Sequence, residues 1–94
     1  MTKFLAMCST GLGSSFMVRM NIEDIVRELQ LPDVTVEHTD ISSAGPESAD
    51  VFFVAKDLED AAQGLGDVVV LNSIIDKDEL RDAVKSAAGR HGLL

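Results

Sequence analysis

The sequence has few of the residues that cross-link a small domain or bind a metal ion. Its 94 residues contain no tryptophan, no tyrosine and a single cysteine, Cys8. One cysteine excludes an internal disulfide, and one cysteine with two histidines is a poor set of zinc ligands. Hydrophobic burial must therefore hold the fold, and we expect neither a metal nor a cofactor.

Long apolar runs are also missing. No run approaches the roughly 20 residues that a membrane-spanning helix needs. The apolar segment at residues 4–7 is shorter than the h-region of a signal peptide, which takes about 7–15 residues. We therefore expect a cytoplasmic protein that does not insert into a membrane.

Positive charge is scarce. Lysine and arginine number 8 against 16 aspartates and glutamates, so the net charge is −8. Nucleic-acid binding requires basic patches that displace phosphate counterions, so a nucleic-acid partner is excluded. An anionic ligand could bind only where the chain supplies a local positive field.

The apolar content is enough for one compact domain. Hydrophobic residues make up 46% of the chain, which excludes a disordered, charge-extended polymer. A chain of 94 residues closes one core, and no internal repeat divides it. We therefore expect a single domain over residues 1–94.

Strand and helix patterns alternate along this domain. Four short apolar runs predict strands, at residues 3–7, 34–38, 50–55 and 67–71. Helical patterns are found at residues 15–29, around residues 58–62 and at residues 77–88. Strands that are apolar on both faces indicate an α/β fold, an open parallel sheet with helices on both faces.

Three helix ends carry recognisable signals. Ser14 or Ser15 is the expected N-cap of the first helix. Asp76, followed three residues later by Glu79, resembles a capping box at the start of the last helix. Gly89 lies where a C-terminal cap of that helix belongs.

Cys8 follows the first strand directly, at the edge where open parallel sheets bind ligands. Glycines in the loop after it allow successive N–H groups to point to one centre, and the next helix adds its positive end. The predicted anion cradle consists of Ser9, Thr10, Gly11, Leu12, Gly13, Ser14 and Ser15. Its field is expected to lower the pKa of the Cys8 thiol from the usual value of about 8.5.

The loop differs from four known motifs, because each of them needs a residue that the sequence lacks at the required position. A cysteine-phosphatase loop needs arginine at position 14, which is Ser14, and a Walker A loop needs lysine there. A dinucleotide loop needs glycine at Phe16, and a Cys-x-x-Cys pair needs cysteine at Gly11. A carrier that passes a phosphoryl group onward fits best. A low-molecular-weight phosphatase and a regulatory or binding module on the same fold stay open.

Three segments resemble one known family. They are Cys8-Ser-Thr-Gly-Leu-Gly-Ser-Ser-Phe-Met-Val, Val36-Glu-His-Thr-Asp40 and Leu71-Asn-Ser-Ile-Ile-Asp76. They are similar to the IIB component of the bacterial phosphoenolpyruvate-dependent sugar phosphotransferase system, the ascorbate type above all and the galactitol type next. The chain departs from many relatives at Ser9, where they have glycine.

This resemblance implies both a topology and a reaction. The sheet would be four-stranded in the order 2-1-3-4, as in flavodoxin-like folds. A phosphohistidine of the IIA component would phosphorylate Cys8, the catalytic residue. Cys8 would then phosphorylate a sugar, L-ascorbate, held by the membrane permease IIC.

Other residues at this edge could assist Cys8 or simply be solvated: His38, Asp40, Lys56, Asn72 and Ser73. Phe16, Met17 and Met20 lie partly off the apolar stripe of the first helix, so they predict a docking surface, with core packing as the alternative. Arg19 and Arg27 are expected on solvated faces, and His91 is given no role.

Overall fold

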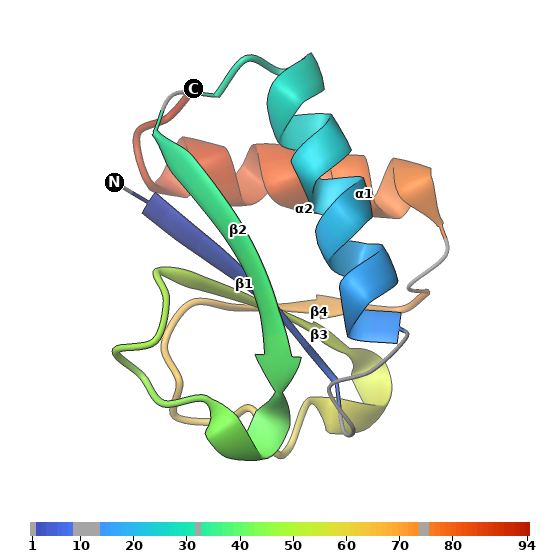
Figure 1. The fold of residues 1–94 in the computed structure, drawn as a ribbon, viewed down its shortest axis with the longest axis vertical. Coiled ribbons are helices and arrows are strands. Elements are labelled where there is room, and N and C mark those ends of the chain that lie inside the picture. The colour runs from blue at the N-terminus through green and yellow to red at the C-terminus, as the bar shows by residue number, and fades with distance from the viewer. Residues whose placement is uncertain (1, 9–13, 32, 74–75) are drawn as a thin grey trace.

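A computed structural model describes residues 2–8, 14–31, 33–73 and 76–94. Its elements are β1 (Thr2–Cys8), α1 (Ser14–Glu28), β2 (Val34–Asp40), the 3-10 helix η1 (Ile41–Ser43), β3 (Val51–Ala55), the 3-10 helix η2 (Lys56–Leu58), β4 (Val68–Leu71) and α2 (Lys77–Arg90). Figure 1 shows the two α-helices together against a twisted sheet.

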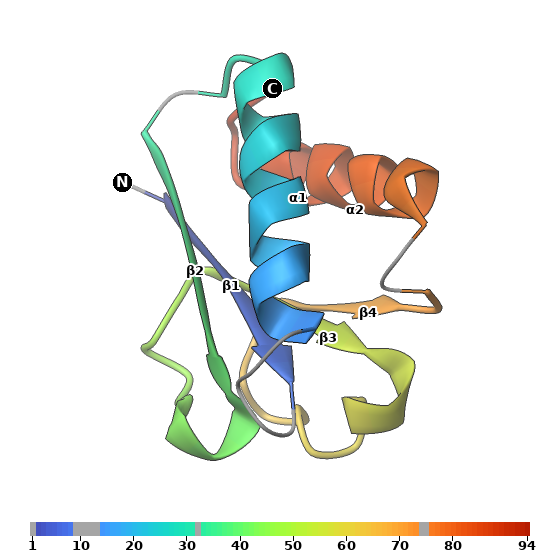
Figure 2. The same ribbon diagram turned by 45° about the vertical axis from the view of Figure 1, so that its right-hand side comes forward.

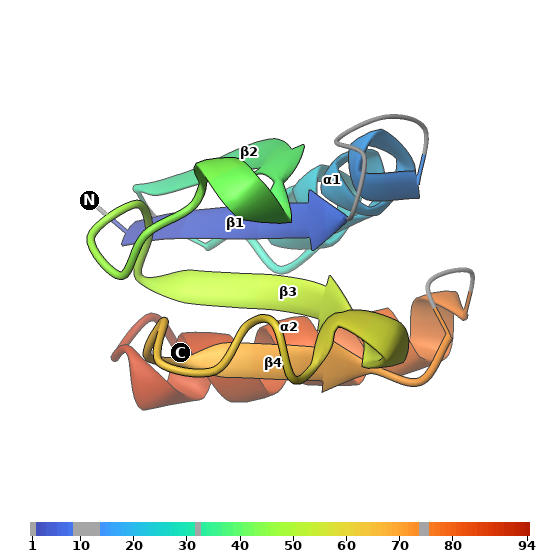
Figure 3. The ribbon, with the colours of Figure 1, turned by 90° about the horizontal axis from the view of Figure 1, so that it is seen from below.

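The sheet confirms the predicted topology. Its four strands are all parallel and lie in the order β2-β1-β3-β4. Phe4 pairs with Val36 on one side and with Val51 on the other, so β1 is a central strand. The strands point the same way in Figure 3, and their carboxyl ends form one edge of the molecule. At that edge Cys8 pairs with Asp40.

Both α-helices pack on the same face of the sheet, as the rotated view in Figure 2 shows. The core on this face combines strand residues with the apolar stripes of both helices, and the Phe4 and Phe53 rings lie 5.5 Å apart. Its largest fully buried members include Phe4, Phe53, Ile22, Ile25, Leu71, Leu80 and Val84.

The opposite face has a smaller core, built on Leu5, Met7, Phe52 and Val54. The segments after β2 and after β3 cover it, and they lie on the near side of the sheet in Figure 3. The helix expected around residues 58–62 is only η2 followed by turns, and Gly64 at the end of these turns has a left-handed φ of 88°. Among the described residues this face thus carries 3-10 helices, whereas the prediction of helices on both faces expected α-helices here too.

Two predicted helix ends are wrong by a few residues. The α1 helix already includes Ser14 and Ser15, so neither is its N-cap. The α2 helix continues past Gly89 to Arg90, and Gly92 is the residue with the left-handed φ, 74°. The Leu93 N–H then donates to the Ala88 carbonyl at 2.8 Å, which closes the last turn.

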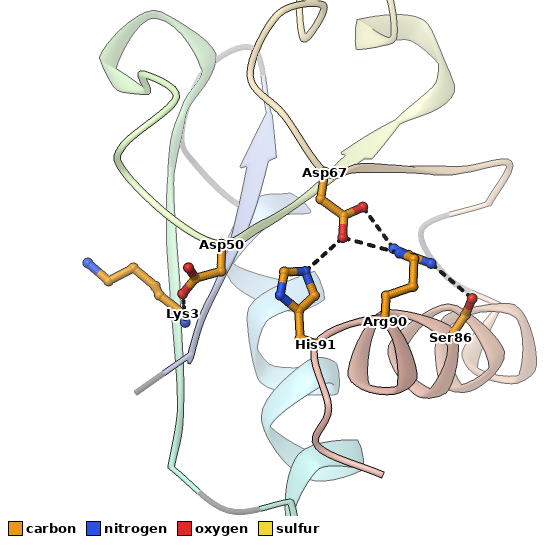
Figure 4. A network of polar contacts seen from close by, with 6 residues as sticks. All are labelled: Lys3, Asp50, Asp67, Ser86, Arg90 and His91. Carbon is orange, nitrogen blue, oxygen red and sulfur yellow. Dashed lines mark hydrogen bonds and ion pairs between the residues drawn. The ribbon is translucent and has the colours of Figure 1, made fainter.

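Polar contacts at the amino edge of the sheet tie the end of α2 to the start of β4 (Figure 4). The Asp67 carboxylate accepts from Nη2 of Arg90 at 2.8 Å and from Nε at 3.2 Å. Nε2 of His91 lies 2.8 Å from the same carboxylate, and Arg90 also donates to Ser86. His91 thus has a structural partner that the sequence did not suggest.

Candidate active site

Cys8 lies at the carboxyl edge of the sheet, between β1 and α1. Cys8 is the last residue of β1, and α1 begins at Ser14, the sixth residue after it. Residues 9–13, on which most of the predicted anion cradle falls, lie outside the described residues. Ser14 and Ser15 form the first turn of α1, so the helix does begin at the predicted cradle.

The two α-helices both begin at this edge, but their first turns differ in charge. The first turn of α2 contains Asp78 and Glu79, and its N-cap Asp76 accepts from the N–H groups of both. The first turn of α1 contains no acidic residue. The positive end of α1 is therefore not neutralised by its own first turn, as an anion site at a helix N-terminus requires.

His38 lies two residues before the end of β2 and contacts α1. Its Nδ1 is 3.1 Å from Nη1 of Arg19. The ring of Phe16 meets the imidazole edge to face, with centroids 5.3 Å apart and an interplanar angle of 63°. A guanidinium only donates, so Nδ1 accepts and a neutral ring carries its proton on Nε2.

Arg19 is an unexpected member of this edge. Its side chain is one-third exposed, and its Nε is 3.6 Å from the Glu23 carboxylate, too long for a hydrogen bond. That Nε atom is buried and makes no hydrogen bond to another described residue. The sequence predicted Arg19 on a solvated face, because the residue pattern of α1 does not indicate a contact with β2.

Asp40 stabilises the turn that follows β2. Its carboxylate accepts from the Ser43 N–H at 2.9 Å and from the Ser42 hydroxyl at 2.8 Å. These bonds, led by those of Ser43, hold the pKa of Asp40 below its usual value. Asp40 therefore caps η1, which accounts for its position without a role in chemistry.

The segment after β4 is fixed by Glu79, which sequence reasoning assigned to a capping box. Its carboxylate accepts from the backbone N–H of Asn72 at 2.7 Å and of Ser73 at 2.9 Å. Asn72 and Ser73 thus meet α2 through their main chain. Lys56 is exposed at the start of η2, on the same edge.

The apolar residues near the start of α1 are exposed. Phe16, Met17 and Met20 keep 48%, 40% and 49% of their surface accessible. Among the large apolar side chains that the structure describes, Leu94 at 65% is the other exposed one. The core-packing alternative is wrong for these three residues, whereas their use for docking stays a prediction.

The described part of the chain shows neither a group of metal ligands nor a membrane-spanning helix. No group of three or more histidine, cysteine, aspartate or glutamate residues is arranged to hold a metal ion there. No helix in that part is long and apolar enough to cross a membrane.

Comparison with known proteins identifies a family. Residues 3–86 match the family model described as "PTS system, Lactose/Cellobiose specific IIB subunit". A comparison with curated proteins finds no match. The family description supports the predicted IIB component, but it names lactose and cellobiose and does not confirm the ascorbate type.

Proposed function

Since the chain belongs to the family of lactose/cellobiose-type IIB subunits of the phosphotransferase system, we propose that Cys8 carries a phosphoryl group between two partners. The donor is a phosphohistidine on a IIA component, and the acceptor is a sugar bound by the membrane permease IIC. IIB domains are phosphotransferases in sugar uptake, so the chain is an enzyme of that class. We propose that it works in the cytoplasm.

One observation carries the assignment of Cys8. It is the last residue of β1, at the carboxyl edge of a parallel sheet, and a helix without first-turn carboxylates begins at Ser14. Open α/β sheets bind ligands at this edge, and helix N-termini favour anions. A thiolate and a bound phosphoryl dianion are both anions, so the same backbone stabilises the carrier before and after transfer.

The two transfers balance as follows. The Cys8 thiolate attacks phosphorus, an S–P bond forms and the N–P bond of the donor breaks; the departing imidazole nitrogen keeps the bonding pair. In the second transfer a sugar hydroxyl oxygen attacks, an O–P bond forms, the S–P bond breaks and the thiolate is regenerated. The hydroxyl proton leaves with a base or water at the permease. The contribution of residues 8–15 is positioning and electrostatic stabilisation.

Two other functions share this fold. A low-molecular-weight phosphatase would need an arginine where the chain has Ser14, to clamp the phosphoryl group during hydrolysis. A regulatory module would not need the thiol at all, so Cys8→Ser would leave its function intact.

The type of reaction does not by itself identify the sugar substrate. The loop starting at Cys8 favours L-ascorbate, whereas the family description favours lactose or cellobiose. We propose L-ascorbate as the substrate. Vesicles that contain a cognate IIC and the phosphorylated chain should convert L-ascorbate to its phosphate faster than they convert either disaccharide.

Intact-mass analysis tests the central proposal. The chain is incubated with phosphoenolpyruvate, the general phosphotransferase proteins and a cognate IIA. The wild-type chain should gain the mass of one phosphoryl group, and Cys8→Ala should gain none. An unchanged wild-type mass, under conditions that phosphorylate IIA, would refute it. Sustained release of phosphate from an aryl phosphate by the isolated chain would favour the phosphatase.

A further inference from the structure

An arginine and a histidine meet just behind the edge that bears Cys8. His38 pairs with Ala6, two residues before the pair that Asp40 makes with Cys8. Two residues of strand rise and one strand spacing put the Cα atoms of His38 and Cys8 about 8 Å apart. Arg19 lies in the second turn of α1 and contacts His38 at 3.1 Å, so the pair lies one strand over from Cys8 and two residues back from the carboxyl edge.

The Arg19 guanidinium has donors to spare. It has five N–H donors in a planar fork that matches phosphate and carboxylate geometry. Nη1 meets His38, and the buried Nε is in an ion pair with Glu23 at 3.6 Å, without a hydrogen bond among the described residues. The side chain is one-third exposed, so its terminal N–H groups can also bind an anion that arrives at the surface.

The same contact orients His38. With Nδ1 accepting from Arg19 and the Phe16 ring packed against the imidazole, the neutral ring presents its proton on Nε2. The pair therefore combines a permanent positive charge with a neutral N–H donor, both of which suit a phosphoryl oxygen.

The surrounding charge favours a dianion. Arg19 is the only charged residue of α1 before Glu23, on a chain with a net charge of −8. Glu23 offsets part of this charge and Asp40 lies beside Cys8 in the register, so the guanidinium is a local exception to the acidic surface.

We infer that Arg19 and His38 form a phosphoryl-recognition pair, through which the chain distinguishes a phosphorylated donor from the same donor without phosphate. Arg19 binds the incoming phosphoryl oxygens and fixes the ring of His38, and His38 donates from Nε2. The inference rests on the proposed function, since it assigns residues to the arrival of the phosphoryl group that Cys8 accepts.

Donor binding in a background that cannot react tests the pair. The dissociation constant of Cys8→Ala is measured with phosphorylated and with unphosphorylated IIA. We expect this variant to prefer the phosphorylated form. Adding Arg19→Gln should reduce the preference by at least about tenfold, the loss expected for a hydrogen bond to a charged group. Arg27→Gln is the matched control, because Arg27 is on the same helix, is 72% exposed and pairs only locally with Asp24.

A spectroscopic measurement separates recognition from a general structural role. The imidazole ¹⁵N shifts of His38 should report a proton on Nε2 in the parent and a mixture of the two neutral tautomers after Arg19→Gln. Circular dichroism confirms that the variants are folded. If Arg19→Gln unfolds the chain, the absence of a Nε2-protonated tautomer in the folded parent still refutes the pair.

In the binding experiment, three results would overturn the inference: no preference of Cys8→Ala for phosphorylated IIA, equal weakening of both donor forms by Arg19→Gln, or an equal effect of Arg27→Gln. The wild-type chain is assayed for Cys8 phosphorylation in parallel. A wild-type chain that is phosphorylated while Arg19→Gln keeps the full preference refutes the pair alone. A wild-type chain that is never phosphorylated refutes the proposed function itself.

Discussion

Asp67→Asn perturbs the contact that ties the end of α2 to the start of β4. In the wild type, two nitrogens of Arg90 donate to the Asp67 carboxylate at 2.8 and 3.2 Å, and His91 contacts it at 2.8 Å (Figure 4). Asparagine keeps the size of the side chain but loses its charge, and it replaces one acceptor oxygen with a donor. The substitution therefore removes the two-pronged ion pair with little change in packing.

The expected loss of stability depends on how exposed the Asp67 and Arg90 side chains are to solvent. Exposed ion pairs contribute about 0–1 kcal/mol, and hydrogen bonds to charged groups about 1.5–3 kcal/mol. The Asp67 side chain is 25% exposed and that of Arg90 is 44% exposed, so screening places the pair between these limits. We expect Asp67→Asn to lower the free energy of unfolding by about 1 kcal/mol at pH 7. In a domain of this size that is a fall of about 4–8 °C in Tm.

The effect should depend on pH. Burial alone would raise the pKa of Asp67, but the hydrogen bonds and charges of Arg90 and His91 outweigh it and hold the pKa below its ordinary value. A carboxylate with a lowered folded-state pKa stabilises the fold above its unfolded pKa, and that contribution disappears as pH falls through the folded value. The gap between wild type and variant should thus be constant above about pH 5 and should close below about pH 4.

Urea denaturation at a series of pH values measures this gap. Asp24→Asn is the control, because Asp24 forms a single exposed ion pair with Arg27 within α1 and its loss should cost less than about 0.5 kcal/mol. A gap that stays the same from pH 7 to pH 3 would refute the electrostatic reasoning. Phosphorylation of Cys8 should be unchanged in Asp67→Asn, because Asp67 lies at the opposite edge of the sheet.

Three further variants test the turn after β4, the turn after β2 and the exposed apolar residues of α1. Glu79→Gln weakens the acceptor of two main-chain N–H groups after β4 and should lower the free energy of unfolding by about 1–2 kcal/mol in urea titrations; an unchanged midpoint would contradict this. Asp40→Asn should lower stability at pH 7 and by less near pH 3, because hydrogen bonds, led by that of Ser43, hold the pKa of Asp40 below its usual value and their contribution fades as pH falls through the folded-state pKa; thermal melts at both pH values measure the difference. The double variant Met17→Ala and Met20→Ala should weaken IIA binding with less than about 1 kcal/mol of destabilisation, whereas Leu94→Ala, the exposed apolar control, should leave affinity unchanged.

The strands could be predicted because burial on both faces leaves a strong pattern. Val51-Phe52-Phe53-Val54 is apolar at every position and is a central strand, buried throughout. The helix around residues 58–62 was overestimated because Leu58, Ala61 and Ala62 fit one helical turn as well as a longer helix. The structure has η2 there, followed by turns that reach the left-handed Gly64.

Side-chain partners across elements could not be predicted. The position of Glu79, three residues after the N-cap Asp76, fits a capping box, in which its carboxylate would accept from the backbone N–H of the N-cap. In the structure the carboxylate instead accepts from the N–H groups of Asn72 and Ser73 after β4, and the spacing alone cannot distinguish the two. The contact of Arg19 with His38 joins residues 19 apart and depends on how α1 crosses β2. Sequence reasoning placed Cys8, His38 and Asp40 at the functional edge, but the contact of Arg19 with His38 emerged only from the packing.

The unequal first turns of the two α-helices have a consequence for turnover. At the start of α2, Asp76 already accepts from the first N–H groups, whereas the first turn of α1 contains no acidic residue. Once the proposed transfer is complete, the α1 end faces a dianion on Cys8. A second phosphorylated donor then meets added negative charge, while the spent donor has lost its own. We therefore expect the loaded carrier to bind the phosphorylated donor more weakly than the unloaded carrier does.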